Sequence, residues 1–138
     1  PMRARFAAPW LVLGILASCG GRDARFQQYF VQGEKLYEQH CSNCHQKNGQ
    51  GLGRVYPPVH ASDFMQQNFN QVICLMKYGM SGEVVVNGIT YNQAMPGVAA
   101  LTPLELAAIA TYIYNTGEHA RGLVEQTEVS VALQTCRE

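Results

Sequence analysis

The stretch Cys41-Ser42-Asn43-Cys44-His45 determines how the rest of this 138-residue chain is interpreted. Residues three and four apart share a face of a helix, so on a helix Cys41, Cys44 and His45 project together. Two thiols at this spacing can each bond to one vinyl group of a haem, while the adjacent imidazole reaches the iron. The motif therefore predicts one covalently attached haem c, with Cys41 and Cys44 as its attachment points and His45 as an iron ligand.

Two other interpretations of this motif fit less well. A zinc site would need a second ligand pair at zinc spacing, and the sequence contains no second C-x-x-C and no H-x-x-x-H. A thioredoxin-like C-x-x-C would follow a strand in a βαβ unit, whereas a helical pattern precedes Cys41.

Length and charge restrict the possible classes of protein. A chain of 138 residues is expected to form one domain. Its ten basic residues balance its ten acidic residues, so neither a nucleic acid nor an anionic surface is indicated as a partner.

The first eighteen residues are typical of a signal peptide. Two arginines precede an apolar segment, residues 6–17, which is too short to cross a hydrocarbon core of ~30 Å comfortably as a helix. Leu16-Ala17-Ser18-Cys19 resembles a bacterial lipobox, in which Cys19 would become the acylated first residue of the mature protein. The polar residues 19–27 would then tether the domain to the periplasmic side of the inner membrane. An uncleaved anchor or an ordinary buried cysteine is the alternative.

Helical patterns occur at both ends of the expected domain. From Phe26 to His40 apolar residues fall near one stripe, and Gly33 interrupts this helix at a cost in stability, which predicts close approach by another helix. Thr102 and Glu105 form a capping box that opens the last helix, with Leu106, Ile109, Tyr112 and Ile113 on its buried side. Gly117 is expected to end it.

Shorter elements are predicted between these helices. One helix is expected to begin near Ser62, its N-cap, and another covers residues 70–78 and ends at Gly79. Residues 84–91 carry β-branched arms about Asn87-Gly88, which predicts a hairpin with a type I′ turn.

Taken together, these features resemble a class I (mitochondrial-type) cytochrome c of the kind tethered to bacterial membranes. The resemblance covers about Gly33 to Asn115. It is carried by Gly33-Glu34-Lys35-Leu36-Tyr37, the haem motif, Tyr56-Pro57-Pro58-Val59, Tyr91-Asn92-Gln93-Ala94-Met95-Pro96 and Tyr112-Ile113. It implies an all-α class I cytochrome c fold over residues 28–117, with the first and last helices crossed at Gly33 and a small hairpin before a methionine ligand. Residues 118–138 form a tail with no counterpart in the minimal fold.

The resemblance also implies roles for further residues. The Pro57 carbonyl would accept the second ring N–H of His45, and Val59 would pack on the haem. Met95 would be the sixth iron ligand, and Pro96 supports this by keeping Met95 out of a helix. Met65 and Met76 lie in helical stripes, Met80 lies in a flexible turn, and His60 is the next choice as ligand.

Two cysteines, Cys74 and Cys136, have no role in the haem motif or the lipobox. Outside the cytosol a disulfide between them is the economical prediction, and two free thiols are the alternative.

With both axial positions of the iron filled, no site is left for oxygen or peroxide. We therefore expect an electron-transfer protein of the respiratory chain, not an enzyme, with no small-molecule substrate. Membrane respiratory complexes would be its electron donor and acceptor. The alternatives are a permanently docked subunit of a quinol-oxidising assembly, such as alternative complex III, or of an oxidase. A haem sensor, a peroxidase-like enzyme and a structural lipoprotein are less favoured.

Overall fold

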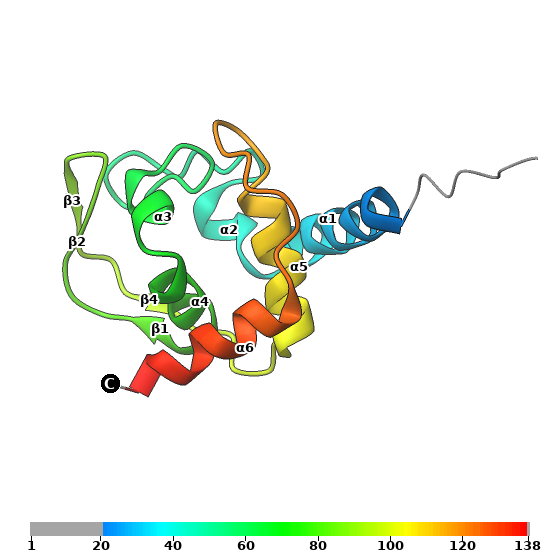
Figure 1. The fold of residues 1–138 in the computed structure, drawn as a ribbon. Helices are drawn as coiled ribbons and strands as arrows, with labels where there is room; N and C mark the ends of the chain where they lie inside the picture. The colour runs from blue at the N-terminus through cyan, green and yellow to red at the C-terminus, as the bar shows by residue number, and fades with distance from the viewer. Residues whose placement is uncertain (1–20, 138) are drawn as a thin grey trace, which may run out of the picture.

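The computed structural model describes residues 21–137, and helices dominate this part of the chain (Figure 1). The helices are α1 (Gly21–His40), α2 (Ser42–His45), α3 (Asp63–Gln67), α4 (Phe69–Tyr78), α5 (Pro103–Ile113), α6 (Gln126–Gln134) and the 3₁₀ helix η1 (Thr135–Arg137). Two small antiparallel ladders accompany them, β1 (Gly79–Met80) with β4 (Met95–Pro96) and β2 (Val84–Val86) with β3 (Ile89–Tyr91). The predicted all-α class is confirmed.

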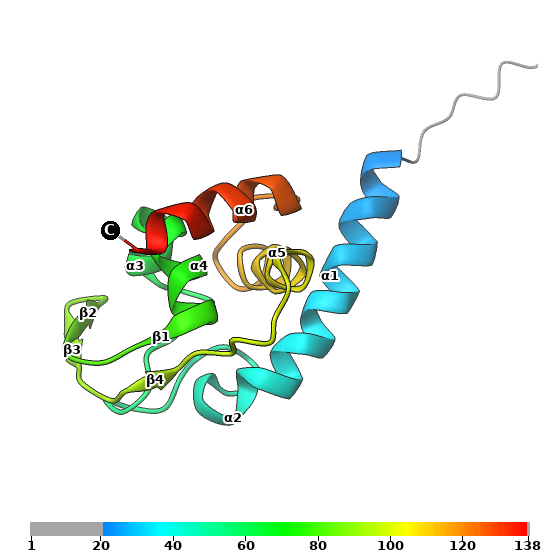
Figure 2. The same cartoon turned by 90° about the horizontal axis from the view of Figure 1, so that it is seen from below.

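Helices α1 and α5 cross at Gly33, as predicted (Figure 2). A Cβ atom at Gly33 would lie 2.0 Å from the carbonyl oxygen of Ala108, so only glycine permits this approach. Beside the crossing, the rings of Tyr37 and Tyr112 lie 5.4 Å apart. Helix α1 begins at Gly21, earlier than the predicted start at Phe26, so most of the stretch predicted as a polar tether is helical.

The capping box predicted for the last helix is present. The Thr102 side chain accepts from the Glu105 backbone N–H, and the Glu105 carboxylate accepts from the Thr102 N–H. The prediction that this helix ends at Gly117 was wrong, because α5 ends at Ile113. The Asn115 side chain bonds the carbonyls of Thr111 and Gly122 and the Gly122 N–H, so these side-chain bonds hold the chain in a turn.

The predicted elements between α1 and α5 are also present. The Ser62 hydroxyl caps α3 by accepting from the Met65 N–H. In the hairpin, Asn87 and Gly88 both have positive φ, at 52° and 76°, as a type I′ turn requires. The Asp63 carboxylate accepts from the Asn87 N–H, which ties the tip of the hairpin to the start of α3.

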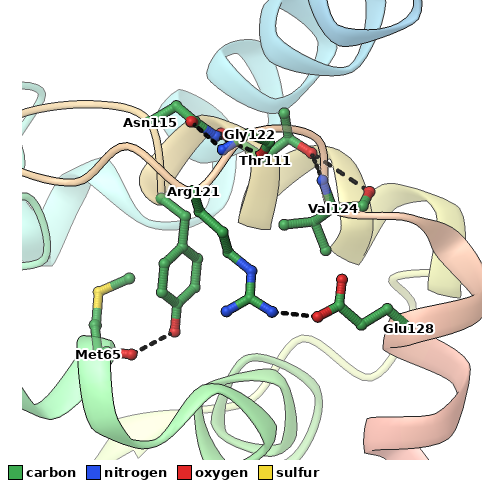
Figure 3. A network of polar contacts seen from close by, with 8 residues as sticks. Met65, Thr111, Asn115, Arg121, Gly122, Val124 and Glu128 are labelled. Atoms are coloured by element: carbon green, nitrogen blue, oxygen red, sulfur yellow. Dashed lines mark hydrogen bonds and ion pairs between the residues drawn. The ribbon is translucent and has the colours of Figure 1, made fainter. Parts of the chain in front are cut away.

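The tail, for which no structure was predicted, folds back on the domain. Helix α6 packs against α4 and α5, and Cys136 is bonded to Cys74 of α4 in a disulfide. The Thr111 hydroxyl accepts from the Val124 N–H, and the Arg121 guanidinium pairs with Glu128 (Figure 3). Val124, Val129 and Ala132 are fully buried, so the tail extends the hydrophobic core.

Within residues 21–137 no helix has the length and hydrophobicity to cross a membrane. The predicted signal peptide and Cys19 lie outside the described residues.

Candidate functional site

An open, mostly apolar cavity lies between the haem motif, the hairpin and the helices α3, α4 and α5. Its walls include every residue predicted to contact the haem or its iron: Cys41, Cys44, His45, Pro57, Val59 and Met95. Residues from separate stretches of the sequence therefore meet in one place.

The haem motif turns sharply after α1. The Cys41 N–H still donates to the Tyr37 carbonyl, as in a continuing helix, and the N–H groups of Cys44 and His45 then both donate to the Cys41 carbonyl. This single turn places both thiols and the imidazole along the cavity. Both cysteines are free of disulfides.

Burial favours the uncharged forms of the Cys41 thiol and the His45 imidazole. It raises the pKa of the Cys41 thiol to about 11, and it lowers the pKa of His45 although the hydrogen bond to Pro57 opposes this. An uncharged imidazole is the form of histidine that binds a metal.

The His45 ring is oriented by Pro57. Its Nδ1 lies 2.9 Å from the Pro57 carbonyl oxygen, and because a carbonyl can only accept, Nδ1 must carry the proton and donate. The Nε2 lone pair is then available to a metal.

The glycine-rich loop after the haem motif brings Pro57 to this position. The Gly51 N–H donates to the His45 carbonyl at 2.9 Å, which folds the loop back on the motif. A Cβ atom at Gly51 would lie 2.2 Å from the Tyr56 carbonyl oxygen, so a larger residue would push the Tyr56–Pro57 segment away. The N–H of Val59 donates to the Gly49 carbonyl and fixes the other side of the segment.

Met95 lies on the wall formed by the β1–β4 ladder. Met80 is its partner in the register, and side chains of directly opposed residues point to the same face of a ladder. Both methionines line the cavity, and so do Met65 and Met76. Met80 was expected in a flexible turn, but it is part of this ladder because its backbone pairs with the segment that carries Met95.

His60, the alternative sixth ligand, is not among the residues that line the cavity. Its ring packs against Gly117, and its Nδ1 is buried without a hydrogen-bond partner in the described structure. The structure therefore separates His60 from the other predicted haem residues.

Some lining residues were not predicted. Val84 lines the cavity and Val86, also lining it, is almost fully buried, while Val85 between them is exposed. This alternation of strand residues was a usable signal for the inward side of the hairpin. Tyr91 and Gln93 also line the cavity and supply two of its few polar groups.

These residues fit a covalently held haem. Two free thiols and an oriented neutral imidazole meet at an apolar cavity with thioether sulfurs on its wall, and sulfur and nitrogen are both axial ligands of haem iron in proteins. By contrast, residues 21–137 contain no cluster of three or more His, Cys, Asp or Glu side chains that could hold a metal ion alone. The zinc interpretation therefore has no support in this part of the chain.

Comparisons with known proteins agree with this geometry. The family model described as Cytochrome c matches residues 30–117. Two curated relatives, both named Cytochrome c-552, come from Thermus thermophilus. Each is 35% identical over 60% of this chain, and the aligned region spans 66% of the first relative's length and 58% of the second's. The chain thus spans less than two thirds of each relative.

Proposed function

The chain belongs to the cytochrome c family, and from this premise we propose that it is a monohaem electron carrier with its iron held between His45 and Met95. Members of this family bind haem c covalently and transfer electrons. When bound, haem c supplies one-electron chemistry through its iron. The observation that carries the proposal is the orientation of His45 by the Pro57 carbonyl beside Cys41 and Cys44 in one cavity.

Six of the residues that line the cavity have a definite role in this proposal. Cys41 and Cys44 hold the haem through thioether bonds, which fix it without depending on axial ligation. The Pro57 carbonyl holds the His45 ring in the orientation and tautomer that iron binding requires. It also makes Nε2 of His45 a stronger electron-pair donor to a metal. Met95 would supply sulfur from the β1–β4 ladder, and ligation of the iron by His45 and Met95 would raise the reduction potential of the haem. Val59 and the other apolar lining residues would limit the contact of the haem with water.

The attachment and partners belong to the same proposal. We propose that Cys19 is acylated and tethers the protein to the periplasmic side of the bacterial inner membrane, supported by the lipobox-like Leu16-Ala17-Ser18-Cys19. The electron donor and acceptor would be membrane respiratory complexes. Recovery of the haem protein alone after detergent extraction supports a mobile carrier, whereas recovery inside a large assembly supports a fixed subunit.

The ligand assignment is tested by comparing Met95→Ala with Met80→Ala. Both methionines line the same wall and pair in the register, so Met80→Ala is a matched control for losing a thioether there. We expect Met95→Ala to lose the sulfur–iron absorption band and to bind carbon monoxide when reduced, while Met80→Ala keeps the band.

The opposite pattern, with the band lost in Met80→Ala and kept in Met95→Ala, would assign the ligand to Met80. Retention of the band in both single variants would contradict Met95 ligation. A denatured protein without added haem mass would contradict the whole proposal.

A further inference from the structure

The segment that follows Met95 is bound tightly to the end of α4. We call residues 95–101 the ligand loop. At its start, Met95 and Pro96 pair with Met80 and Gly79 in the short ladder. In its middle, the Val98 N–H donates to the Met76 carbonyl at 2.9 Å. Both contacts use backbone groups of α4 or of the residues directly after it.

The end of the ligand loop is held by a side chain with no role in the haem site. The Lys77 ammonium donates to the Ala99 carbonyl at 2.5 Å and to the Leu101 carbonyl at 2.6 Å. Lys77 is half-buried and projects from the last turn of α4. One cation therefore bridges the Ala99 and Leu101 carbonyls, just ahead of Thr102, which caps α5.

The Glu105 carboxylate is not a direct partner of the Lys77 ammonium, because it is hydrogen-bonded to Thr102. Lys77 and His40 both contribute electrostatically to lowering the pKa of Glu105, but the larger cause is the hydrogen bonding of its carboxylate to Thr102. The direct partners of the Lys77 ammonium are thus the two loop carbonyls, and no carboxylate among residues 21–137 forms a salt bridge with it.

Such a clamp matters because a thioether is a weak, neutral ligand. Its hold on iron depends on how rarely the loop that carries it opens, and local opening is governed by the few contacts that fasten the loop. Hydrogen bonds from a charged donor are stronger than those between neutral groups. Two of them at one end of the ligand loop therefore add to the backbone contacts that hold its start and middle.

We propose that Lys77 is a positioning residue for the sixth ligand: its ammonium group clamps the ligand loop onto α4 and so keeps Met95 at the wall of the haem cavity. This inference rests on the proposed ligation by Met95. It deepens that proposal by naming a residue that neither contacts iron nor lines the cavity.

The test uses the complete haem protein and cyanide as the probe. Cyanide takes the sixth position of oxidised iron only when Met95 has left it, so its binding rate measures opening of the loop. We expect Lys77→Met, which keeps an unbranched side chain but removes the charge and donors, to raise this rate by about tenfold or more. Lys77→Arg, which keeps the charge and N–H donors, should bind cyanide more slowly than Lys77→Met.

Lys35→Met is the matched control. Lys35 is an exposed lysine of α1, outside the cavity and the ligand loop, and its replacement changes the net charge by the same amount. We expect it to leave the cyanide rate unchanged.

Two results would overturn the role of Lys77. One is a Lys77→Met rate equal to that of Lys35→Met. The other is a lowered melting temperature in Lys77→Met with no faster cyanide binding, which would mean a purely structural role. The experiments distinguish failure of Met95 ligation from failure of the Lys77 clamp. Retention of the sulfur–iron band in Met95→Ala would contradict both proposals. Loss of the band in Met95→Ala, together with equal cyanide binding rates in Lys77→Met and Lys35→Met, would contradict only the proposed role of Lys77.

Discussion

The Tyr114 hydroxyl illustrates what a single residue contributes to the wall of the haem cavity. It donates to the Met65 carbonyl at 2.9 Å, joining the end of α5 to the short helix α3, and Met65 lines the cavity. Burial raises the pKa of Tyr114, so the hydroxyl remains a donor. The Arg121 guanidinium lies 3.9 Å from the centre of the Phe69 ring and 5.5 Å from that of Tyr114, which places a tail residue in the same cluster.

We predict that Tyr114→Phe destabilises the protein by about 1–3 kcal/mol, because the buried Met65 carbonyl loses its donor and gains no water in return. The free energy of unfolding in denaturant measures this loss. Tyr78→Phe is the control, because Tyr78 is about half exposed and its hydroxyl can bond water. Equal effects of the two substitutions would show that the hydroxyl of Tyr114 contributes nothing specific.

At this scale the sequence was informative where chemistry and spacing are local. Cys41, Cys44 and His45 could be predicted as haem-binding residues from sequence because all three lie close together on one helical turn. Met95 could not be separated from Met80 by position in the cavity, because the ladder places both on the same wall. Lys77 carried no recognisable pattern, since its partners are backbone carbonyls more than twenty residues away.

At the scale of secondary-structure elements, the crossing of α1 and α5 depends on one missing side chain. Gly33 allows the backbone of α5 to approach, and the aromatic rings of Phe30, Tyr37 and Tyr112 pack around the contact. Any Cβ atom at this position would force the two helices apart along their whole contact.

Gly33→Ala should therefore destabilise the protein by about 1–3 kcal/mol or more, although alanine favours the helix itself. Gly21→Ala in the same helix is the control, since a Cβ atom there would meet nothing within 4 Å. Thermal unfolding followed by circular dichroism compares the two. A Gly33→Ala protein as stable as Gly21→Ala would disprove the role assigned to the close approach.

Most elements could be predicted because their signals are local. The Thr102 capping box, the Ser62 cap and the Asn87-Gly88 turn each involve side chains and backbone groups within a few residues. The end of α5 was misplaced at Gly117 because Asn115 stops the helix by bonding to Gly122, a contact that depends on where the following chain runs.

At the scale of the whole molecule, the tail is fastened to the helix that supports the haem cavity. The disulfide joins residues 62 positions apart, and α4 in turn contributes Val72, Leu75 and Met76 to the cavity wall. The bridge thus links the C-terminal tail to the core of the fold.

Replacing both Cys74 and Cys136 by alanine is expected to lower the free energy of unfolding by about 4 kcal/mol, because the denatured chain regains the entropy of a closed loop. Chemical denaturation of the wild-type haem protein and of the double variant measures this difference in the free energy of unfolding. Counting thiols in unfolded, non-reduced protein provides the control, and we expect no thiol from Cys74 or Cys136. Two reactive thiols, or an unchanged stability in the double variant, would contradict the bridge.

The amino-acid sequence by itself determined the caps of the helices and the hairpin, and it predicted the haem attachment at Cys41 and Cys44 and the iron ligand His45, because each is encoded within one turn or one loop. The contact between Pro57 and His45 was expected from the resemblance to the cytochrome c family, and it is present. Only the tertiary structure decided that Met80 opposes Met95, that His60 is turned away, and that the tail folds into a helix on α4. These depend on packing between segments far apart in the chain, where many partners are compatible with any short pattern and the close fit of the whole core selects one.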